Sequence, residues 1–570
     1  MTQMGKKIVV IGGVAGGASV AARARRLDEK AEVIMFEKGP NVSFSNCSLP
    51  YHLSGTIKNA DDIVLMDPKQ FKAQYNIDAR VNREVIDVNP TERTVEIKDT
   101  TNGETSFESY DELFFSPGAT PILPQSIKGI DGSNVFTIRN VDDIKRLKKF
   151  IDDVHAETIS VIGGGFIGVE TAENLIKGGY NVNLIEGADH ILGTIDYDMA
   201  QIIQKTMLDN GVNLKTGETL TEIHDDKIVL DSGKELPSEV VVMSIGVKPD
   251  TALAEQIGLE IGPMGGIKVN QNYETNIPHI HAVGDAIEVY HRILRRPTRL
   301  NLAFPAQIQA RQAVDHIYGR QIRNRGVIGS QCIPVFEMNV ASTGLTEKEC
   351  RQNGIEYRTA MVIPKDHVAL LPNATPLYMK LVFAYPSGEI LGAQAVGQSS
   401  VDKQIDVIAT EITNGGYVED LETLELCYQP TFSTAKNAVN MVGLVAQNIL
   451  NNEFKQVSVD QVRQLVEDGA TIIDVREQFE YEAGHVKNAK NIPMSVFREH
   501  LDEIPRNKPV YIHCLSGQRS YNVVRALTNL GYDNIYNIAG SFLDISEYEY
   551  YEDQTQDREP IVTAYRFDLL

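Results

Sequence analysis

The segment Ile159–Gly168 reads ISVIGGGFIG and decides the fold of the chain around it. An apolar run leads into glycines at 163, 165 and 168, and after a helical stretch a second apolar run, NVNLIEG, ends at Glu186. Strand, glycine turn, helix and strand in this order predict a βαβ unit. The glycines let the backbone approach a pyrophosphate at the helix N-terminus, and the acid can accept a hydrogen bond from a ribose hydroxyl. We therefore predict a dinucleotide-binding α/β unit.

The same order of elements occurs at the beginning of the chain. The apolar run Lys7–Ile11 leads into GGVAGG (Gly12–Gly17), and the following strand, EVIMFEK, carries Glu37 20 residues after the last glycine. Val14 replaces the middle glycine, so a tight turn without a ligand is the alternative for this copy alone. Two such units in one chain predict two dinucleotides, a flavin and a nicotinamide. The nicotinamide is expected to be NADH, because Glu186 would repel a 2′-phosphate.

A single cysteine, Cys47, lies between these units in SFSNCSLPY (Ser43–Tyr51), and the next thiol is Cys332. Without a resolving thiol nearby, a redox-active Cys47 must pass through a mixed disulfide with a small thiol, a persulfide or a sulfenic acid. The short polar residues around it are suited to a turn or a helix N-terminus, where amide dipoles lower the pKa of a thiol. A buried structural cysteine is the alternative.

The composition is that of an acidic globular protein. A length of 570 residues predicts three or four domains, and a formal charge of -23 argues against a nucleic-acid surface. The five cysteines, at 47, 332, 350, 427 and 514, have neither disulfide-framework nor zinc spacing, which indicates a reducing compartment and no metal site. Arginines directly after the first glycines argue against a signal peptide, and no uncharged apolar run reaches about 18 residues. We expect a soluble cytoplasmic protein.

Five motifs together carry a family resemblance. GGVAGG, SPGATP, GGGFIG, SIGVKPD and HAVGDA, in this order, resemble the flavoprotein disulfide reductases with two dinucleotide folds. With SFSNCSLPY the chain resembles their single-cysteine branch, which includes coenzyme A disulfide reductase. The resemblance implies an α/β fold with two Rossmann-like domains and an α+β dimerisation domain. The implied FAD-binding domain spans 1–155 and 281–325, the NAD-binding domain 156–280, and the dimerisation domain 326–445.

The resemblance also implies binding residues, and it implies a homodimer. For FAD these are Gly12, Val14, Ala15, Gly16, Glu37, Lys38, Val85, Ser116, Pro117, Gly118, Arg139, Gly284, Asp285, Pro305 and Ala306. For NADH they are Gly163, Gly165, Phe166, Ile167, Gly168, Glu170, Glu186 and Gly246, with Phe166 as a gate over the flavin ring. For coenzyme A, as substrate or tightly bound ligand, they are Ser19, Arg23, Arg26, Ser43, Phe44, Asn46 and Lys436. On spacing alone, the two arginines would form a solvated helix face.

The dimerisation domain contains ELCYQPTFSTAKNAVN (Glu425–Asn440), which by itself predicts a helical segment after a Gln-Pro turn. In the family the residue matching Tyr428 reaches the active site of the partner subunit, so Tyr428 is a candidate proton donor. The family commonly has a second tyrosine in a YYPGA run, whereas this chain reads LLPNA at Leu370–Ala374. The loss of that hydroxyl argues against efficient turnover of a plain disulfide.

A second resemblance begins after a polar linker, predicted at 446–457. TIIDVREQFEYEAGHVKNAKNIP followed by VYIHCLSGQRS resembles a rhodanese domain, expected at 458–553. The six-residue loop Cys514–Arg519 should curl its amides toward the sulfur, with a helix N-terminus behind it and the guanidinium nearby. A C-x5-R phosphatase loop would need one more residue, and an inactive relic is the alternative. The stretch SEYEYYEDQTQDREP and the acidic tail 554–570 are expected to be solvated.

Three functions compete. The first is reduction of coenzyme A persulfide, and of polysulfide, with electrons passing from NADH through FAD to Cys47. In this function Cys514 handles sulfane sulfur. The fused rhodanese domain favours coenzyme A persulfide as the substrate, and coenzyme A disulfide is the runner-up. The second is an NADH peroxidase or oxidase, but those relatives have a histidine where this chain has Ala15. The third is a sulfur carrier with a vestigial flavin fold, which the two intact nucleotide motifs oppose.

Overall fold

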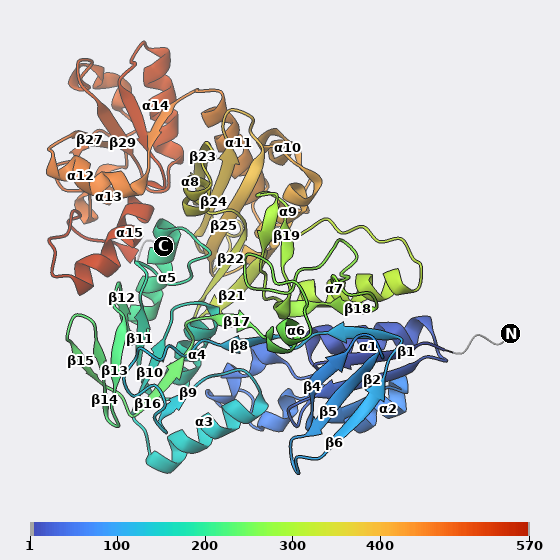
Figure 1. Ribbon diagram of the computed structural model, residues 1–570. Coiled ribbons are helices and arrows are strands. Elements are labelled where there is room, and N and C mark those ends of the chain that lie inside the picture. Colours follow the sequence, from blue (N-terminus) through green and yellow to red (C-terminus); the bar gives the residue numbers. More distant parts are fainter. Residues whose placement is uncertain (1–4, 568–570) are drawn as a thin grey trace. The chain divides into compact units, whose positions relative to one another are not determined.

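The computed structural model describes residues 5–567 of the chain (Figure 1). The chain divides into two compact units, Met1–Ile185 with Glu218–Val327, and Glu186–Gly217 with Ile328–Leu570. Between residues 5 and 567, no helix is both long and apolar enough to cross a membrane.

The first unit is built on a parallel sheet of order β18-β7-β1-β2-β3. The central strand β1 pairs in parallel with β2 and β7, and its side chains Val9 and Val10 are fully buried, as expected for a strand covered on both faces. Helices α1 and α7 pack against each other beside it. The bounds are β1 Lys7–Ile11, α1 Ala15–Leu27, β2 Glu32–Glu37, α2 Pro68–Tyr75, β3 Asp78–Val81, β7 Glu112–Phe115, β18 Ile280–Ala282 and α7 Ala303–Ile317.

A second parallel sheet contains β11, β10, β16 and β9 in that order. Its strands and helices are β9 Val135–Phe136, α3 Val141–Val154, β10 Thr158–Ile162, α4 Phe166–Lys177, β11 Asn181–Glu186 and β16 Val240–Met243. Antiparallel sheets and connections complete the unit: β4 Arg83–Asn89, β5 Thr94–Asp99, β6 Thr105–Ser109, β8 Ala119–Pro121, β13 Leu220–Ile223, β14 Lys227–Leu230, β15 Glu235–Pro237, β17 Val247–Pro249, α6 Ala252–Gln256, β19 Val289–His291 and β20 Arg296–Thr298. Four short 3₁₀ helices are η1 Asn46–Ser48, η2 Pro50–His52, η3 Ala60–Ile63 and η4 Gly284–Ala286. The two parallel sheets confirm the predicted α/β class.

The second unit contains an antiparallel sheet of order β21-β22-β25-β24-β23, against which α9 and α11 pack. Its elements, with those of residues 186–217, are α5 Tyr197–Asp209, β12 Asn213–Thr216, β21 Gln331–Val335, β22 Met338–Gly344, α8 Glu347–Gln352, β23 Tyr357–Val362, β24 Leu377–Ala384, β25 Ile390–Gly397, α9 Val401–Asn414, α10 Val418–Thr423 and α11 Ala438–Leu450. The helix predicted after the Gln-Pro turn begins only at Ala438, where the Asn437 side chain caps it by accepting from the Val439 N–H.

The last sheet of this unit is parallel, with the order β26-β30-β29-β27-β28. Its elements are β26 Lys455–Val457, η5 Val459–Gln461, α12 Val462–Glu467, β27 Thr471–Asp474, α13 Gln478–Ala483, β28 Lys490–Asn491, η6 Phe497–Glu499, η7 Leu501–Glu503, β29 Val510–His513, α14 Gln518–Asn529, β30 Ile535–Ile538 and α15 Ser541–Thr555. The predicted linker 446–457 is therefore too long. Its first residues are the end of α11, and its last three are a strand that pairs with β30.

The prediction of a solvated stretch is wrong for residues 546–553 of SEYEYYEDQTQDREP, which are buried or half-buried, whereas Gln554–Asp557 and Glu559 are exposed. Most of the stretch belongs to α15, which packs against α5. Glu549 and Asp553 are 1% and 7% exposed, and each accepts hydrogen bonds from both Arg463 and Arg558. These arginines compensate the cost of burying carboxylates, so acidic composition did not mean exposure.

Candidate active site

The Cys47 thiol lies in η1 and is exposed. Ser43, which has a positive φ of 50°, donates its N–H to the Gly13 carbonyl at 2.8 Å. The Ser45 N–H donates to Ile63 at 3.0 Å, and the hydroxyls of Ser45 and Ser48 lie 2.7 Å apart. The backbone thus ties the cysteine segment to the first glycine turn, and brings together two motifs that the sequence identified separately.

The prediction of a lowered thiol pKa at Cys47 is not supported. Burial by the surrounding protein and the charges of Glu170 and Asp285 raise the pKa of Cys47, and a backbone hydrogen bond opposes them only in part. The three-residue η1 is too short to supply a strong helix dipole. Burial and the charge of Glu173 also raise the pKa of Glu170, to about 7. The thiol therefore faces a carboxyl group that titrates near neutral pH.

The first glycine turn is suited to a pyrophosphate. Gly12 has a φ of +97°, and a Cβ on Gly17 would lie 1.8 Å from the Gly12 carbonyl oxygen, so both positions require glycine. Helix α1 begins after Val14 without a side-chain cap, which leaves its first amides available to an anion. Glu37 accepts the Gly13 N–H at 2.9 Å, so this acid stands at the turn as predicted from its spacing.

Three other segments predicted to bind FAD meet beside this turn. A Cβ built on Gly16 would lie 2.5 Å from the Ser116 hydroxyl, and one on Gly284 would lie 3.5 Å from it. Arg139 donates to the Pro117 carbonyl at 3.3 Å. Burial raises the pKa of Asp285, which follows Gly284 in η4. A cradle of small residues with one half-buried acid fits a dinucleotide with ribityl hydroxyls.

The remaining predicted FAD residues are more dispersed. Gly118 follows Pro117, with its φ at +77°. Lys38 pairs with Asp250 at 3.1 Å, and Val85 is buried in β4. Ala15, Pro305 and Ala306 lie in the first turns of α1 and α7.

Sequence reasoning missed two residues that support this site. Gln309 on α7 accepts the Gly284 N–H at 2.7 Å and so holds the η4 turn. Arg299 donates to the Val247 carbonyl at 2.8 Å, and its charge opposes the raised pKa of Asp285. Both lie outside any glycine motif, so no local pattern indicated them.

The second glycine turn repeats the first. Gly163 has a φ of +107°, and a Cβ on Gly168 would lie 1.8 Å from the Gly163 carbonyl oxygen. At Gly165, the N-cap of α4, a Cβ would meet nothing within 4 Å, so the space before the helix is open to a ligand. Phe166, Ile167 and Glu170 lie in the first turns of α4.

Two further predicted NADH residues belong to neighbouring strands. Glu186 is the last residue of β11, and its carboxylate accepts the Ala188 N–H at 2.7 Å. Gly246, with a φ of +112°, precedes β17.

The arginines predicted to contact coenzyme A differ from each other. Arg23 is 9% exposed, and its Nε donates to Asp315 on α7 at 2.9 Å. It is therefore not part of a solvated helix face. Arg26 is exposed, with its guanidinium 5.8 Å from the centre of the Tyr75 ring. Ser19 is half-buried on α1.

The other predicted coenzyme A residues belong to both units. Phe44 bridges to Val64, and the Asn46 side chain donates to the Arg139 carbonyl at 3.5 Å. Lys436 is exposed in the second unit, just before α11.

Two loops of the second unit lie together around Tyr428. The Val368 N–H donates to the Pro430 carbonyl at 3.1 Å, which joins the LLPNA run to the tyrosine segment. Leu370 is 94% exposed and Tyr428 50% exposed. The bond between Val368 and Pro430 links the segment that contains Leu370 to the segment that contains Tyr428.

In the Cys514 loop, one backbone amide faces the sulfur. Cys514 follows β29, is 1% exposed, and its sulfur accepts the Gly517 N–H at 3.2 Å. Gly517, with a φ of +100°, is the N-cap of α14, so the sulfur lies at the start of a 12-residue helix. Arg519 is nearby, but its guanidinium is paired with Glu480.

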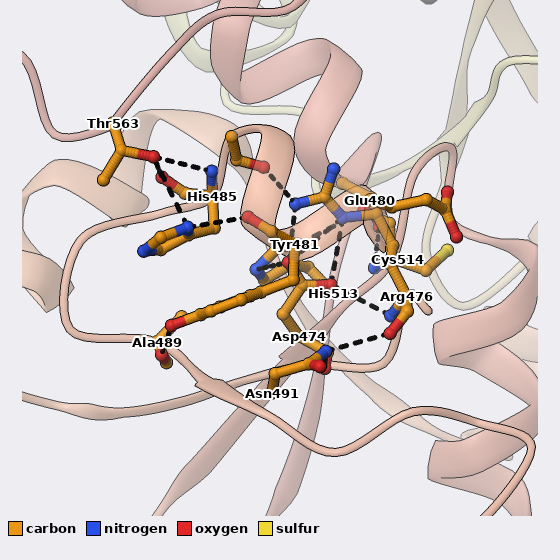
Figure 2. A network of polar contacts seen from close by, with 12 residues as sticks. Asp474, Arg476, Glu480, Tyr481, His485, Ala489, Asn491, His513, Cys514 and Thr563 are labelled. Atoms are coloured by element: carbon orange, nitrogen blue, oxygen red, sulfur yellow. Dashed lines mark hydrogen bonds and ion pairs between the residues drawn. The ribbon is translucent and has the colours of Figure 1, made fainter. Parts of the chain in front are cut away.

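A buried polar network supports this loop (Figure 2). Both Asp474 and Arg476 have no exposed surface, and the arginine Nε lies 3.0 Å from each carboxylate oxygen. Burial lowers the pKa of His513, the residue before the cysteine, although Asp474, 3.7 Å away, opposes this shift. No motif identified these three residues, and the approach of His513 to Asp474 depends on strands β27 and β29 lying side by side.

Comparisons with known proteins agree with this geometry. Family models match at residues 6–310 (pyridine nucleotide-disulphide oxidoreductase), 331–439 (its dimerisation domain) and 458–548 (rhodanese-like domain). The coenzyme A disulfide reductase of Staphylococcus epidermidis is 31% identical over 77% of this chain and 100% of its own length. Reduced Bacillus anthracis CoADR-RHD has a TM-score of 0.92 at 41% identity, covering 95% of this chain and 98% of that one. An NAD-dependent persulfide reductase from A. fulgidus has a TM-score of 0.89 at 31% identity, covering 94% and 99%.

These matches confirm the predicted fold class and the predicted resemblance. Two nucleotide-binding sheets, a dimerisation sheet and a rhodanese-like sheet occur in the expected order. The chain belongs to the pyridine nucleotide-disulphide oxidoreductase family, with a rhodanese-like domain following its dimerisation domain.

Proposed function

We propose that this protein is an NADH-dependent flavoprotein that reduces coenzyme A persulfide, and also polysulfide, through Cys47, while Cys514 handles sulfane sulfur. One observation carries the proposal: the exposed Cys47, tied to the first glycine turn, is the only cysteine of its unit. A single thiol of this kind must exchange sulfur with a small-molecule partner. Coenzyme A disulfide is the alternative substrate.

The chemistry at Cys47 begins with attack of its thiolate on the substrate S–S bond. Attack on the outer sulfur of a coenzyme A persulfide leaves a Cys47 persulfide and releases the coenzyme A thiolate, whereas attack on a disulfide leaves a mixed disulfide. Bound FAD would supply the two electrons, taken from NADH, that release sulfide or thiol from Cys47. Glu170, with its pKa of about 7, is suited to hold or deliver a proton beside the sulfur.

We assign NADH rather than NADPH to the second glycine turn. Glu186 ends β11 at the position from which a carboxylate accepts a ribose hydroxyl hydrogen bond and repels a 2′-phosphate. Membership of the family supports either NADH or NADPH, and Glu186 supports the choice of NADH.

We assign coenzyme A to a site that two subunits share. Ser43, Phe44, Asn46 and Arg26 would contact it from the Cys47 side, because they lie in or near the cysteine segment and Arg26 has an exposed charge. Lys436 and Tyr428 would come from the partner in a homodimer, and the dimerisation domain supports such an assembly. The exposed Tyr428 hydroxyl would donate a proton to the departing thiolate.

The test uses two substrates and two cysteine variants. We expect Cys47→Ser to abolish NADH-dependent reduction of every sulfur substrate while FAD stays bound, because the flavin is held by other residues. We expect Cys514→Ser to keep reduction of preformed coenzyme A persulfide and to lose reduction of thiosulfate-derived sulfur. Cys427→Ser, at another exposed cysteine, is the matched control. Persulfide turnover by Cys47→Ser at the wild-type rate would refute the proposal.

A further inference from the structure

The guanidinium of Arg519, in the Cys514 loop, is paired with Glu480. Its two terminal nitrogens donate to the two carboxylate oxygens at 2.6 and 2.8 Å, a bidentate pair of the strongest kind. Glu480 is itself fixed, since it accepts the Glu477 N–H at 3.0 Å within the capping box of α13. The pair is partly shielded, with side-chain exposures of 32% for the arginine and 13% for the acid.

The charge of Arg519 is therefore cancelled locally. Burial favours the neutral acid, but the hydrogen bonds from Arg519 outweigh it and hold the pKa of Glu480 below its ordinary value. Glu480 is thus ionised at neutral pH. The other arginine beside the loop, Arg476, is paired with Asp474 through its Nε and one terminal nitrogen (Figure 2). Each of these two cations is paired with a carboxylate, so an incoming anion meets a negative charge beside each of them, although Nη1 of the buried Arg476 has no hydrogen-bond partner among residues 5–567.

We propose that Glu480 is a specificity-determining residue of the rhodanese-like domain: by holding Arg519 it disfavours dianionic sulfur donors such as thiosulfate and favours donors with a single charge. A dianion must displace the carboxylate or bind beside it, and repulsion between like charges doubles when the donor carries two charges instead of one. The inference rests on the proposed role of Cys514 in sulfur transfer. Glu480 acts through Arg519, so it is a positioning residue and not a catalytic one.

The transfer step is the same for donors of either charge. The Cys514 thiolate attacks the sulfane sulfur of thiosulfate, the S–S bond of the donor breaks, and sulfite departs with the electron pair, leaving a Cys514 persulfide anion. With benzenethiosulfonate, a monoanion, benzenesulfinate departs instead. Cyanide then takes the outer sulfur as thiocyanate and regenerates the thiolate. Because the two donors share this chemistry, a difference between them reports on charge at the site.

The experiment measures thiocyanate formation by the full-length protein with these two donors. Glu480→Gln removes the charge and frees Arg519 to donate to the anion. Because hydrogen bonds to charged groups are stronger than neutral ones, we expect the KM for thiosulfate to fall about tenfold or more. The KM for benzenethiosulfonate should fall about threefold, because its charge is half as large. The kcat should stay the same for both donors.

Two variants separate charge from structure. Glu482→Gln removes the same charge from an exposed position on α13, where the side chain contacts Gln478, and should leave both KM values unchanged. Glu480→Asp keeps the charge and should retain a KM for thiosulfate near that of the wild type. A split between KM and kcat of this kind would not arise from a general loss of structure.

Several outcomes would overturn the inference. Equal changes with both donors in Glu480→Gln, or no change in KM, would show that the pair is only structural. If Glu480→Gln has a melting temperature well below that of the wild type, the test uses the wild-type protein alone. The inference then requires that the wild-type KM for thiosulfate exceed the wild-type KM for benzenethiosulfonate. The reverse order of the two KM values refutes the inference. A wild-type protein that is inactive with both donors would overturn the transfer role of Cys514 itself, and the inference with it.

Discussion

Glu547 on α15 allows a quantitative prediction of how the local stability of this helix depends on pH. The side chain is 3% exposed, and burial raises its pKa to about 7 against the opposing charge of Lys205. One oxygen lies 3.5 Å from the Tyr378 hydroxyl, and the other has no hydrogen-bond partner among residues 5–567. Charged or titratable groups that act on it are Lys205 and Asp209 on α5, Tyr378 on β24, and Asp544 on α15.

The sign of the pH dependence follows from the raised pKa. A carboxyl group that binds its proton more tightly when folded contributes stability that is complete below its unfolded pKa of 4.5 and is lost as the pH rises through about 7. A shift of this size corresponds to about 3 kcal/mol, of which about 2.5 kcal/mol is lost between about pH 5 and about pH 8. Glu547→Gln keeps the shape and removes the titration, so that loss should disappear.

Hydrogen–deuterium exchange of the α15 amides measures the free energy of local opening. Between the two pH values, the wild type should lose about 2.5 kcal/mol more than Glu547→Gln. Glu552→Gln is the control, since it removes a charge from the same helix and keeps an acceptor for the Tyr197 hydroxyl, which lies 2.9 Å from Glu552. Parallel pH profiles for the wild type and Glu547→Gln would refute the reasoning.

Two further predictions concern the reductase. The kcat/KM of the wild type should be at least about tenfold higher with NADH than with NADPH. Glu186→Ala should reduce that ratio, because it removes the charge that repels the 2′-phosphate of NADPH. Equal kcat/KM values of the wild type with the two cofactors would contradict the assignment of NADH. Mixed dimers of Cys47→Ser and Tyr428→Phe subunits should be more active than either parent, because one of the two sites regains both groups. Activity no greater than that of the parents would mean that the subunits do not share a site.

Local patterns predicted much of the fold. The strand Lys7–Ile11 and the helix ending at Leu27 occur as expected, because an apolar run and glycines fix a βαβ unit within some 30 residues. The prediction for the pKa of Cys47 was wrong because this pKa does not depend on a local pattern. That pKa depends first on burial by the surrounding protein and then on the charges of Glu170 and Asp285, which are distant in sequence.

The candidate site shows the same division. The Cys514 loop and its sulfur-facing amide followed from one short motif. The engagement of Arg519 by Glu480, and that of Arg23 by Asp315, did not, since each joins segments that no periodicity relates. The sequence shows which charged side chains are present, whereas only the folded structure shows which of them form ion pairs.

The packing of α15 bears on whether the rhodanese-like domain can be separated from the rest of the chain. The helix covers α5, and its Glu547 lies against the otherwise buried hydroxyl of Tyr378. At the other end of the domain, the Asn448 side chain on α11 donates to Tyr521 at 3.0 Å, and Gln456 donates to the Thr359 carbonyl at 3.0 Å. A chain ended after α11 would expose these polar and aromatic surfaces to water, so the rhodanese-like domain is a structural part of its neighbour and not a cassette that recombination could remove cleanly.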